Sequence, residues 1–190
     1  GLDLPEPLGK PMEEKRSLSI TSQIQSSDAL GMIARLEGVA SLAGRVSNTE
    51  KGWEPTGVHL HFSPDKIATF PQERELLVDG HLSYINVESW QDFISEMVTP
   101  LEDNATQREN QTLQLKPVID LTVDMLDLWG IPVQELGMKA EPESEGWQIE
   151  ANAPIIAGTL WIPENILQSP IELDLKHLRL PSSYESDNEL

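Results

Sequence analysis

The stretch IDLTVDM, residues 119–125, alternates apolar and polar side chains at every position. Ile119, Leu121 and Val123 fall on one side of an extended chain, and the acidic and hydroxyl side chains between them fall on the other. A period of two residues predicts a β-strand with one apolar face and one hydrated face. The apolar phase then moves to Leu126, which predicts a β-bulge at this point.

The same alternation extends outward from this stretch in both directions. It recurs at 18–24, 30–36, 42–46, 58–62 and 76–84, and again at 136–140, 147–151, 155–161 and 171–178, where the phase slips once more. Fourteen prolines and twelve glycines supply turns between short elements. We therefore predict a mainly β fold, either a long curved antiparallel meander forming a groove or an open sandwich.

One helix is predicted, over about 87–98. Asn86 is suited to the N-cap position, and Pro100 marks the end. Trp90, Phe93 and Met97 fall at helical spacing between them. An apolar stripe of this kind indicates packing against a core rather than a cofactor site.

These elements suggest an organisation along the chain. We expect a β meander over 1–98 that ends in the helix, a polar connection over 99–114, a second β meander over 115–181 and a frayed tail over 182–190. One continuous domain over 1–181 is the alternative. The chain begins with Gly rather than Met and has no run of about 18 to 20 apolar residues, so we expect a segment of a longer protein that lacks any membrane anchor.

Charge and composition exclude several classes of function. The formal net charge is −19, which repels nucleic acid and anionic lipid head groups. No cysteine is present to form a disulfide, a thiolate metal ligand or a nucleophile. The sequence also lacks a Gly-x-Ser-x-Gly elbow and the glycine-rich phosphate loops, so we expect neither catalytic residues nor a cofactor.

Three groups of residues resemble functional sites and receive simpler interpretations. His59 and His61 share one side of a strand as a metal pair would, but we expect two solvent-facing histidines and no metal. Asp120 and Asp124 flank Thr122 on what we expect to be a solvated strand face. The 5 tryptophans suit a carbohydrate platform, but core or edge packing is the simpler interpretation.

Four longer stretches carry a family pattern. They are LDLPEPLGKP at 2–11, GHLSYINVESW at 80–90, the run from VDMLDLWG to GTLWIP at 123–163, and LDLKHLRLP at 173–181. In this order and spacing the chain resembles the YhdP family of AsmA-like proteins. The resemblance covers most of residues 1–181.

The resemblance implies a long Gram-negative protein held in the inner membrane by one helix, with the rest in the periplasm. It implies a curved β-groove, related to that of TamB, which shields phospholipid acyl chains on their way to the outer membrane. The implied partners are acyl chains and the remainder of the parent chain, and no catalytic residue is carried over. A structural or interaction module without lipid, or a carbohydrate-binding β-sandwich, are the alternatives.

The apolar positions of the strands are the candidate site, since the same side chains would line a lipid groove or fill a closed core. They are Leu18, Ile20, Met32, Leu60, Phe62, Leu82, Ile119, Leu121, Val123, Met138, Ile149, Leu173 and Leu175.

Overall fold

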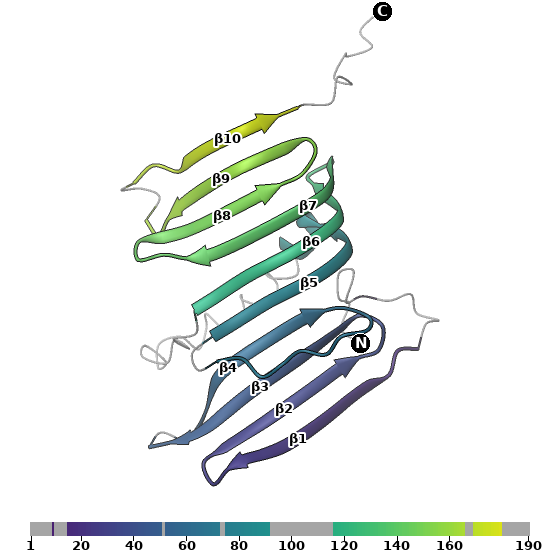
Figure 1. The fold of residues 1–190 in the computed structure, drawn as a ribbon, viewed down its shortest axis with the longest axis vertical. Coiled ribbons are helices and arrows are strands. Elements are labelled where there is room, and N and C mark those ends of the chain that lie inside the picture. Colours follow the sequence, from purple (N-terminus) through teal and green to yellow (C-terminus); the bar gives the residue numbers. More distant parts are fainter. Residues whose placement is uncertain are drawn as a thin grey trace, which may run out of the picture.

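The computed structural model describes residues 9, 15–50, 52–72, 75–91, 116–165 and 169–179. They form one 10-stranded sheet in which each strand lies beside its neighbours in sequence (Figure 1). The strands are β1 (Leu18–Ser26), β2 (Ala29–Leu36), β3 (Ala40–Thr49), β4 (Gly52–Phe62), β5 (Glu75–Asn86), β6 (Lys116–Leu128), β7 (Ile131–Pro142), β8 (Gly146–Asn152), β9 (Ile156–Pro163) and β10 (Glu172–Leu178). The predicted mainly β fold with an open sheet is confirmed.

The strand directions depart from the prediction at β5. This strand runs parallel to both β4 and β6, whereas every other neighbouring pair is antiparallel. An antiparallel pair needs only a short turn, but a parallel pair needs a connection that returns to the starting edge of the sheet. The segments 63–74 and 87–115 provide that length. An antiparallel meander throughout was therefore wrong at this strand.

The pairing register sorts the side chains into rows that cross the whole sheet, because directly paired residues share a face. One row consists of apolar residues and glycine: Leu18, Leu36, Ala40, Phe62, Gly80, Leu121, Met138, Ala151, Gly158 and Leu175. The row beside it on the opposite face is polar throughout: Ser19, Arg35, Ser41, His61, Asp79, Asp120, Lys139, Glu150, Thr159 and Asp174. We call these two surfaces the apolar face and the polar face.

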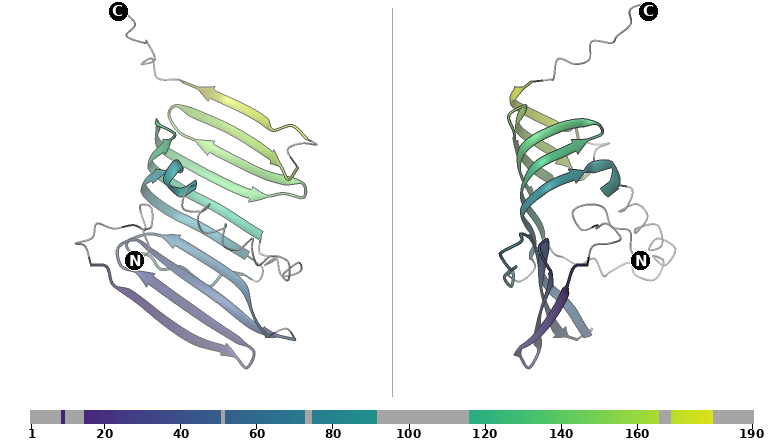
Figure 2. Two further views of the ribbon diagram at one scale, coloured as in Figure 1. Left: turned by 180° about the vertical axis from the view of Figure 1, so that it is seen from behind. Right: turned by 90° about the vertical axis from the view of Figure 1, so that its right-hand side faces the viewer.

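The sheet is twisted, and its middle strands curve toward one side (Figure 2). The bulge predicted near Leu126 is wrong, because β6 and β7 keep one register from Ile119↔Ala140 to Leu128↔Ile131. The change of phase is nevertheless present, since Leu126 packs against the buried apolar cluster on the apolar face. In β5 and β7 the apolar positions also move to the other set of alternate residues at this level, and Glu135 of β7 has a positive φ of 51° there. Because all three strands shift together, the pairing of β6 with β5 and β7 keeps its register. The phase slip near Leu175 does produce a shift in register, between Leu175 and His177.

Gly80 is required where β4 ends beside β5. Its φ is +121°, a conformation that other residues rarely adopt. A Cβ at this position would lie 2.1 Å from the carbonyl oxygen of Phe62. The close approach allows the parallel pair to continue to Phe62, the last residue of β4.

The described part of the predicted helix covers 87–91. Asn86 caps it as expected, because its side-chain Oδ1 accepts a hydrogen bond of 2.8 Å from the backbone N–H of Ser89. Residues 92–98 of the predicted helix, the polar connection at 99–114 and the tail at 182–190 lie outside the described residues. The proposed domain boundaries stay a prediction, although strands from both predicted meanders pair directly through β5 and β6.

Candidate functional site

The apolar face is the candidate site, and the register places every predicted lining residue on it. Leu18, Phe62, Leu121, Met138 and Leu175 belong to the row given above. The next row holds Ile20, Leu60, Ile119, Ile149 and Leu173, while Met32, Leu82 and Val123 occupy further rows of the same face. That these residues line a lipid-binding surface stays a prediction.

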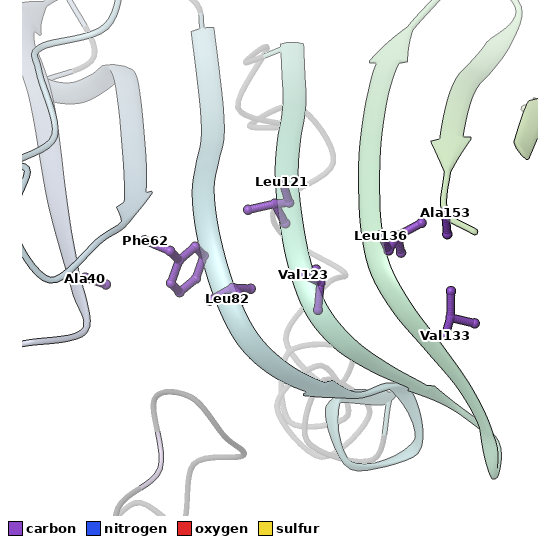
Figure 3. Close-up of a cluster of buried hydrophobic side chains, with 8 residues drawn as sticks. All are labelled: Ala40, Phe62, Leu82, Leu121, Val123, Val133, Leu136 and Ala153. Atoms are coloured by element: carbon purple, nitrogen blue, oxygen red, sulfur yellow. The ribbon is translucent and has the colours of Figure 1, made fainter. Parts of the chain in front are cut away.

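The middle of the apolar face, on strands β4 to β7, is buried. Val123 is 2% exposed and Leu121 is 7% exposed, and Phe62 and Leu82 pack into the same cluster (Figure 3). Curvature of β5, β6 and β7 brings residues from beyond the phase change, including Val133, onto this cluster. The middle of the apolar face is therefore a packed apolar cluster and not an exposed surface.

The outer strands β1 and β10 leave the same face exposed. Leu18 is 63% exposed and Leu173 is 60% exposed. Ile20, Ile24 and Leu178 are also exposed. Large apolar side chains that gather on one surface mark a place where another apolar partner binds.

A hollow of about 410 Å³ borders the buried cluster at Leu82. Val39 and Tyr84 contribute apolar surface to its lining, and Arg16 contributes a polar group. The Arg16 guanidinium donates a hydrogen bond of 3.1 Å to the carbonyl oxygen of Gly9. The apolar face is thus bordered by polar groups at this point.

The polar face is solvated at Asp120, Thr122 and Asp124, as predicted. The interpretation of His59 and His61 as solvent-facing was wrong. His59 is 6% exposed, and the side chain of His61 is only 15% exposed. The segment 66–72 supplies contacts over this area, since the backbone of Thr69 is hydrogen-bonded to the His59 ring.

Asp79 joins the two histidines, and the sequence interpretation missed it. His59 Nε2 donates to Asp79 Oδ1 at 2.8 Å, and His61 Nδ1 donates to the same oxygen at 2.5 Å. Burial acts to raise the pKa of Asp79, but the hydrogen bonds and charges of the two imidazoles together outweigh it and hold this pKa below its ordinary value. The parallel pairing of His61 with Asp79 creates this group, and alternation alone gives no sign of strand direction.

The tryptophans divide into two sets. Trp90, Trp147 and Trp161 are partly buried, in agreement with packing. The packing interpretation was wrong for Trp53 and Trp129, which are exposed. Trp129 lies at the turn between β6 and β7 and has a positive φ of 51°.

Comparison with known proteins identifies one relationship. A family model described as "YhdP protein" matches residues 1–190. No curated protein and no solved structure matches the chain. Within the described residues, no helix has the length and apolar character needed to cross a membrane.

Proposed function

Because the chain belongs to the YhdP family, we propose that it is a lipid-binding segment of an AsmA-like protein. Its apolar face would shield phospholipid acyl chains as they pass from the inner to the outer membrane. The YhdP family is not known as an enzyme family, and the proposal assigns no reaction to the chain. The function is binding and guidance of an apolar ligand.

The exposed apolar side chains of the outer strands carry this proposal. Leu18 and Ile20 on β1, and Leu173 and Leu178 on β10, present apolar surface to the surroundings. Each CH₂ group that moves from water into such surface gains about 0.8 kcal/mol, so an acyl chain needs no specific polar contact to bind. The rows that hold these residues run across all the strands of the sheet, and their side chains are exposed at the outer ends, on β1 and β10.

The charge of the polar face also supports binding of lipid to the apolar face. The polar row carries acidic groups such as Asp120, Glu150 and Asp174, and the whole chain has a net charge of −19. Acidic side chains face water and repel anionic head groups. The ligand would therefore lie on the apolar face alone.

The parent protein supplies the remaining partners in this proposal. Among the described residues, β1 and β10 each pair with a strand on one side only. Unpaired strand edges attract further strands. We propose that neighbouring parts of the parent chain continue the sheet at these edges, in the periplasm, with the parent anchored in the inner membrane.

A structural module without lipid is the second candidate, and the buried middle of the apolar face favours it. Leu121 and Val123 already form a packed core. The two candidates differ in what occupies the outer strands, since a structural module would place protein there and a lipid conduit would place acyl chains.

Native mass spectrometry of the chain, purified from a Gram-negative host with mild detergent, tests the proposal. We expect bound phospholipid on the wild-type chain and its loss in the double variant Leu18→Asp with Leu173→Asp. The matched control is Ser19→Asp with Asp174→Ser, which alters the adjacent residues on the polar face and should keep the lipid. A wild-type chain without lipid would favour the structural module.

A further inference from the structure

The polar face holds a cluster of potential metal ligands that the lipid proposal does not use. His59 and His61 lie two residues apart on β4, so both side chains point to the same face. Asp79 on β5 is the direct ladder partner of His61. Parallel pairing thus brings two imidazoles and one carboxylate together.

The donor atoms of the three side chains are close enough to share one ion. One nitrogen from each ring and one carboxylate oxygen all lie within 4.8 Å of one another. Asp79 Oδ1 already accepts hydrogen bonds from both rings, at 2.8 and 2.5 Å. Tetrahedral ligands at bond lengths of about 2.0 to 2.2 Å lie about 3.3 to 3.6 Å from each other, so a shared ion requires Asp79 Oδ1 to move away from both rings by less than about 1 Å.

A supporting shell holds His59 in place. The ring nitrogen that points away from Asp79, His59 Nδ1, lies 2.9 Å from the carbonyl oxygen of Thr69. The segment carrying Thr69 is itself held to the sheet by a hydrogen bond of 2.7 Å from the Ala68 N–H to Ser41 Oγ. A backbone carbonyl behind a ligating histidine is one of the groups by which proteins fix the ring and its tautomer.

His61 is not fully satisfied by the hydrogen-bonded network. Its Nε2 is buried, and within the described residues it has no hydrogen-bond partner. A buried polar atom without a partner costs about 1 to 3 kcal/mol. Because Nδ1 is the ring nitrogen that contacts Asp79, Nδ1 and not Nε2 is the atom of His61 that could share an ion with Asp79.

The chemistry of the donors selects the class of ion. Imidazole nitrogen suits Zn²⁺ and its neighbours in the first transition series, whereas Mg²⁺ and Ca²⁺ prefer oxygen ligands. Two imidazoles with one carboxylate are a known zinc ligand set that leaves a fourth position open. We propose that His59, His61 and Asp79 bind one Zn²⁺ ion on the polar face, joining β4 to β5.

The chain offers a matched control on the same face. His81 lies 3.2 Å from Asp124 and 3.1 Å from Thr122, but it is exposed and has no second histidine in this contact. If any histidine beside a carboxylate bound zinc on this acidic surface, His81 would do so equally well. Zinc binding by His81→Ala therefore shows whether the ion binds at His59, His61 and Asp79 or at any histidine beside a carboxylate on this acidic surface.

Isothermal titration calorimetry of the 190-residue chain with Zn²⁺, after removal of metals and in excess Mg²⁺, tests the inference. We expect one Zn²⁺ per chain for the wild type and for His81→Ala, and at least ten-fold weaker binding for Asp79→Asn and for His61→Gln. Circular dichroism establishes that each variant is folded, and having two variants keeps the test decisive if one does not fold.

Substitution of Co²⁺ for Zn²⁺ gives an independent readout through its ligand-field absorption, which should appear in the wild type and vanish in Asp79→Asn. Equal zinc binding by the wild type and both cluster variants would overturn the inference, as would an equal loss in His81→Ala. Absence of zinc binding by a folded wild-type chain would also overturn it. None of these results bears on the lipid proposal, which depends on the opposite face.

Discussion

The middle and outer strands of the sheet carry the same kinds of side chain in the same rows but expose them differently. On the apolar face, Leu121 of β6 is 7% exposed, whereas Leu18 of β1 in the same row is 63% exposed. On the polar face, His61 and Asp79 are partly buried, whereas Lys139 and Glu150 in the same row are exposed. Alternation determines which face a residue occupies, and what packs against that face, such as the segment 66–72 over His59, determines whether it is buried.

The largest expected effect is a buried charge in the middle strands. Val123→Asp places a carboxylate in a cluster without a partner, which costs several kcal/mol against a typical total stability of about 5 to 15 kcal/mol. We expect this variant to be unfolded by circular dichroism. Leu173→Asp adds the same charge to an exposed position, so its urea midpoint should stay close to that of the wild type. Equal loss of structure in both variants would show that Leu173 is as important for folding as Val123, contrary to its exposure.

Truncation of apolar side chains should give the next largest difference. Leu121→Ala leaves a cavity in the cluster and should lower the free energy of unfolding by about 2 to 5 kcal/mol. Leu18→Ala removes a mostly exposed side chain and should cost about 0.5 kcal/mol. Urea denaturation with a shared m-value measures both. Similar costs would show that the apolar face of β1 is covered in solution.

On the polar face, Asp79→Asn should reduce the stability of the metal-free chain in a pH-dependent way. The hydrogen bonds from His59 and His61 lower the pKa of Asp79, so its contribution is present above its ordinary pKa and is lost as pH falls through the lowered one. We expect a difference between wild type and variant of about 1 kcal/mol near pH 6. The difference should shrink below about pH 4. Urea titrations across this range in the presence of a chelator measure it, and a constant difference would contradict the assigned contacts.

The smallest expected effect is on the exposed part of the polar face. Lys139 forms an exposed ion pair of 2.9 Å with Glu141, which raises the Lys139 pKa. Because the ion pair raises this pKa, any contribution of the pair to the free energy of unfolding is lost as pH rises through the raised pKa. Solvent screening keeps that contribution small at lower pH. The melting temperature of Lys139→Met should therefore match that of the wild type at neutral pH in differential scanning calorimetry. A clear fall would show that this row is packed against a partner.

Sequence alternation predicted the strands and their two faces well, because side-chain period and burial follow directly from residue type. It did not predict that β5 is parallel to its neighbours, since parallel and antiparallel strands share the same period. The His59 and Asp79 contact was missed for the same reason, as the two residues lie 20 positions apart. The lengths of the connections at 63–74 and 87–115 were the available signals of a parallel return.

The phase change near Leu126 illustrates a second limit. One strand seen alone suggests a bulge, because a shift from odd to even positions usually needs an extra residue. Here β5, β6 and β7 change phase at the same level, so no register is lost and the sheet curves instead. A change shared by three strands is visible only once their pairing is known.

Site-specific photocrosslinking in cells can show whether phospholipid lies on the apolar face of the outer strands, with a benzophenone amino acid placed on either face of β1 and β10. We expect phospholipid adducts from positions 20 and 173 on the apolar face, and none from positions 19 and 174 on the polar face. Phospholipid adducts from both faces, or from neither face while protein adducts form at positions 20 and 173, would show that the apolar face of these strands does not bind lipid.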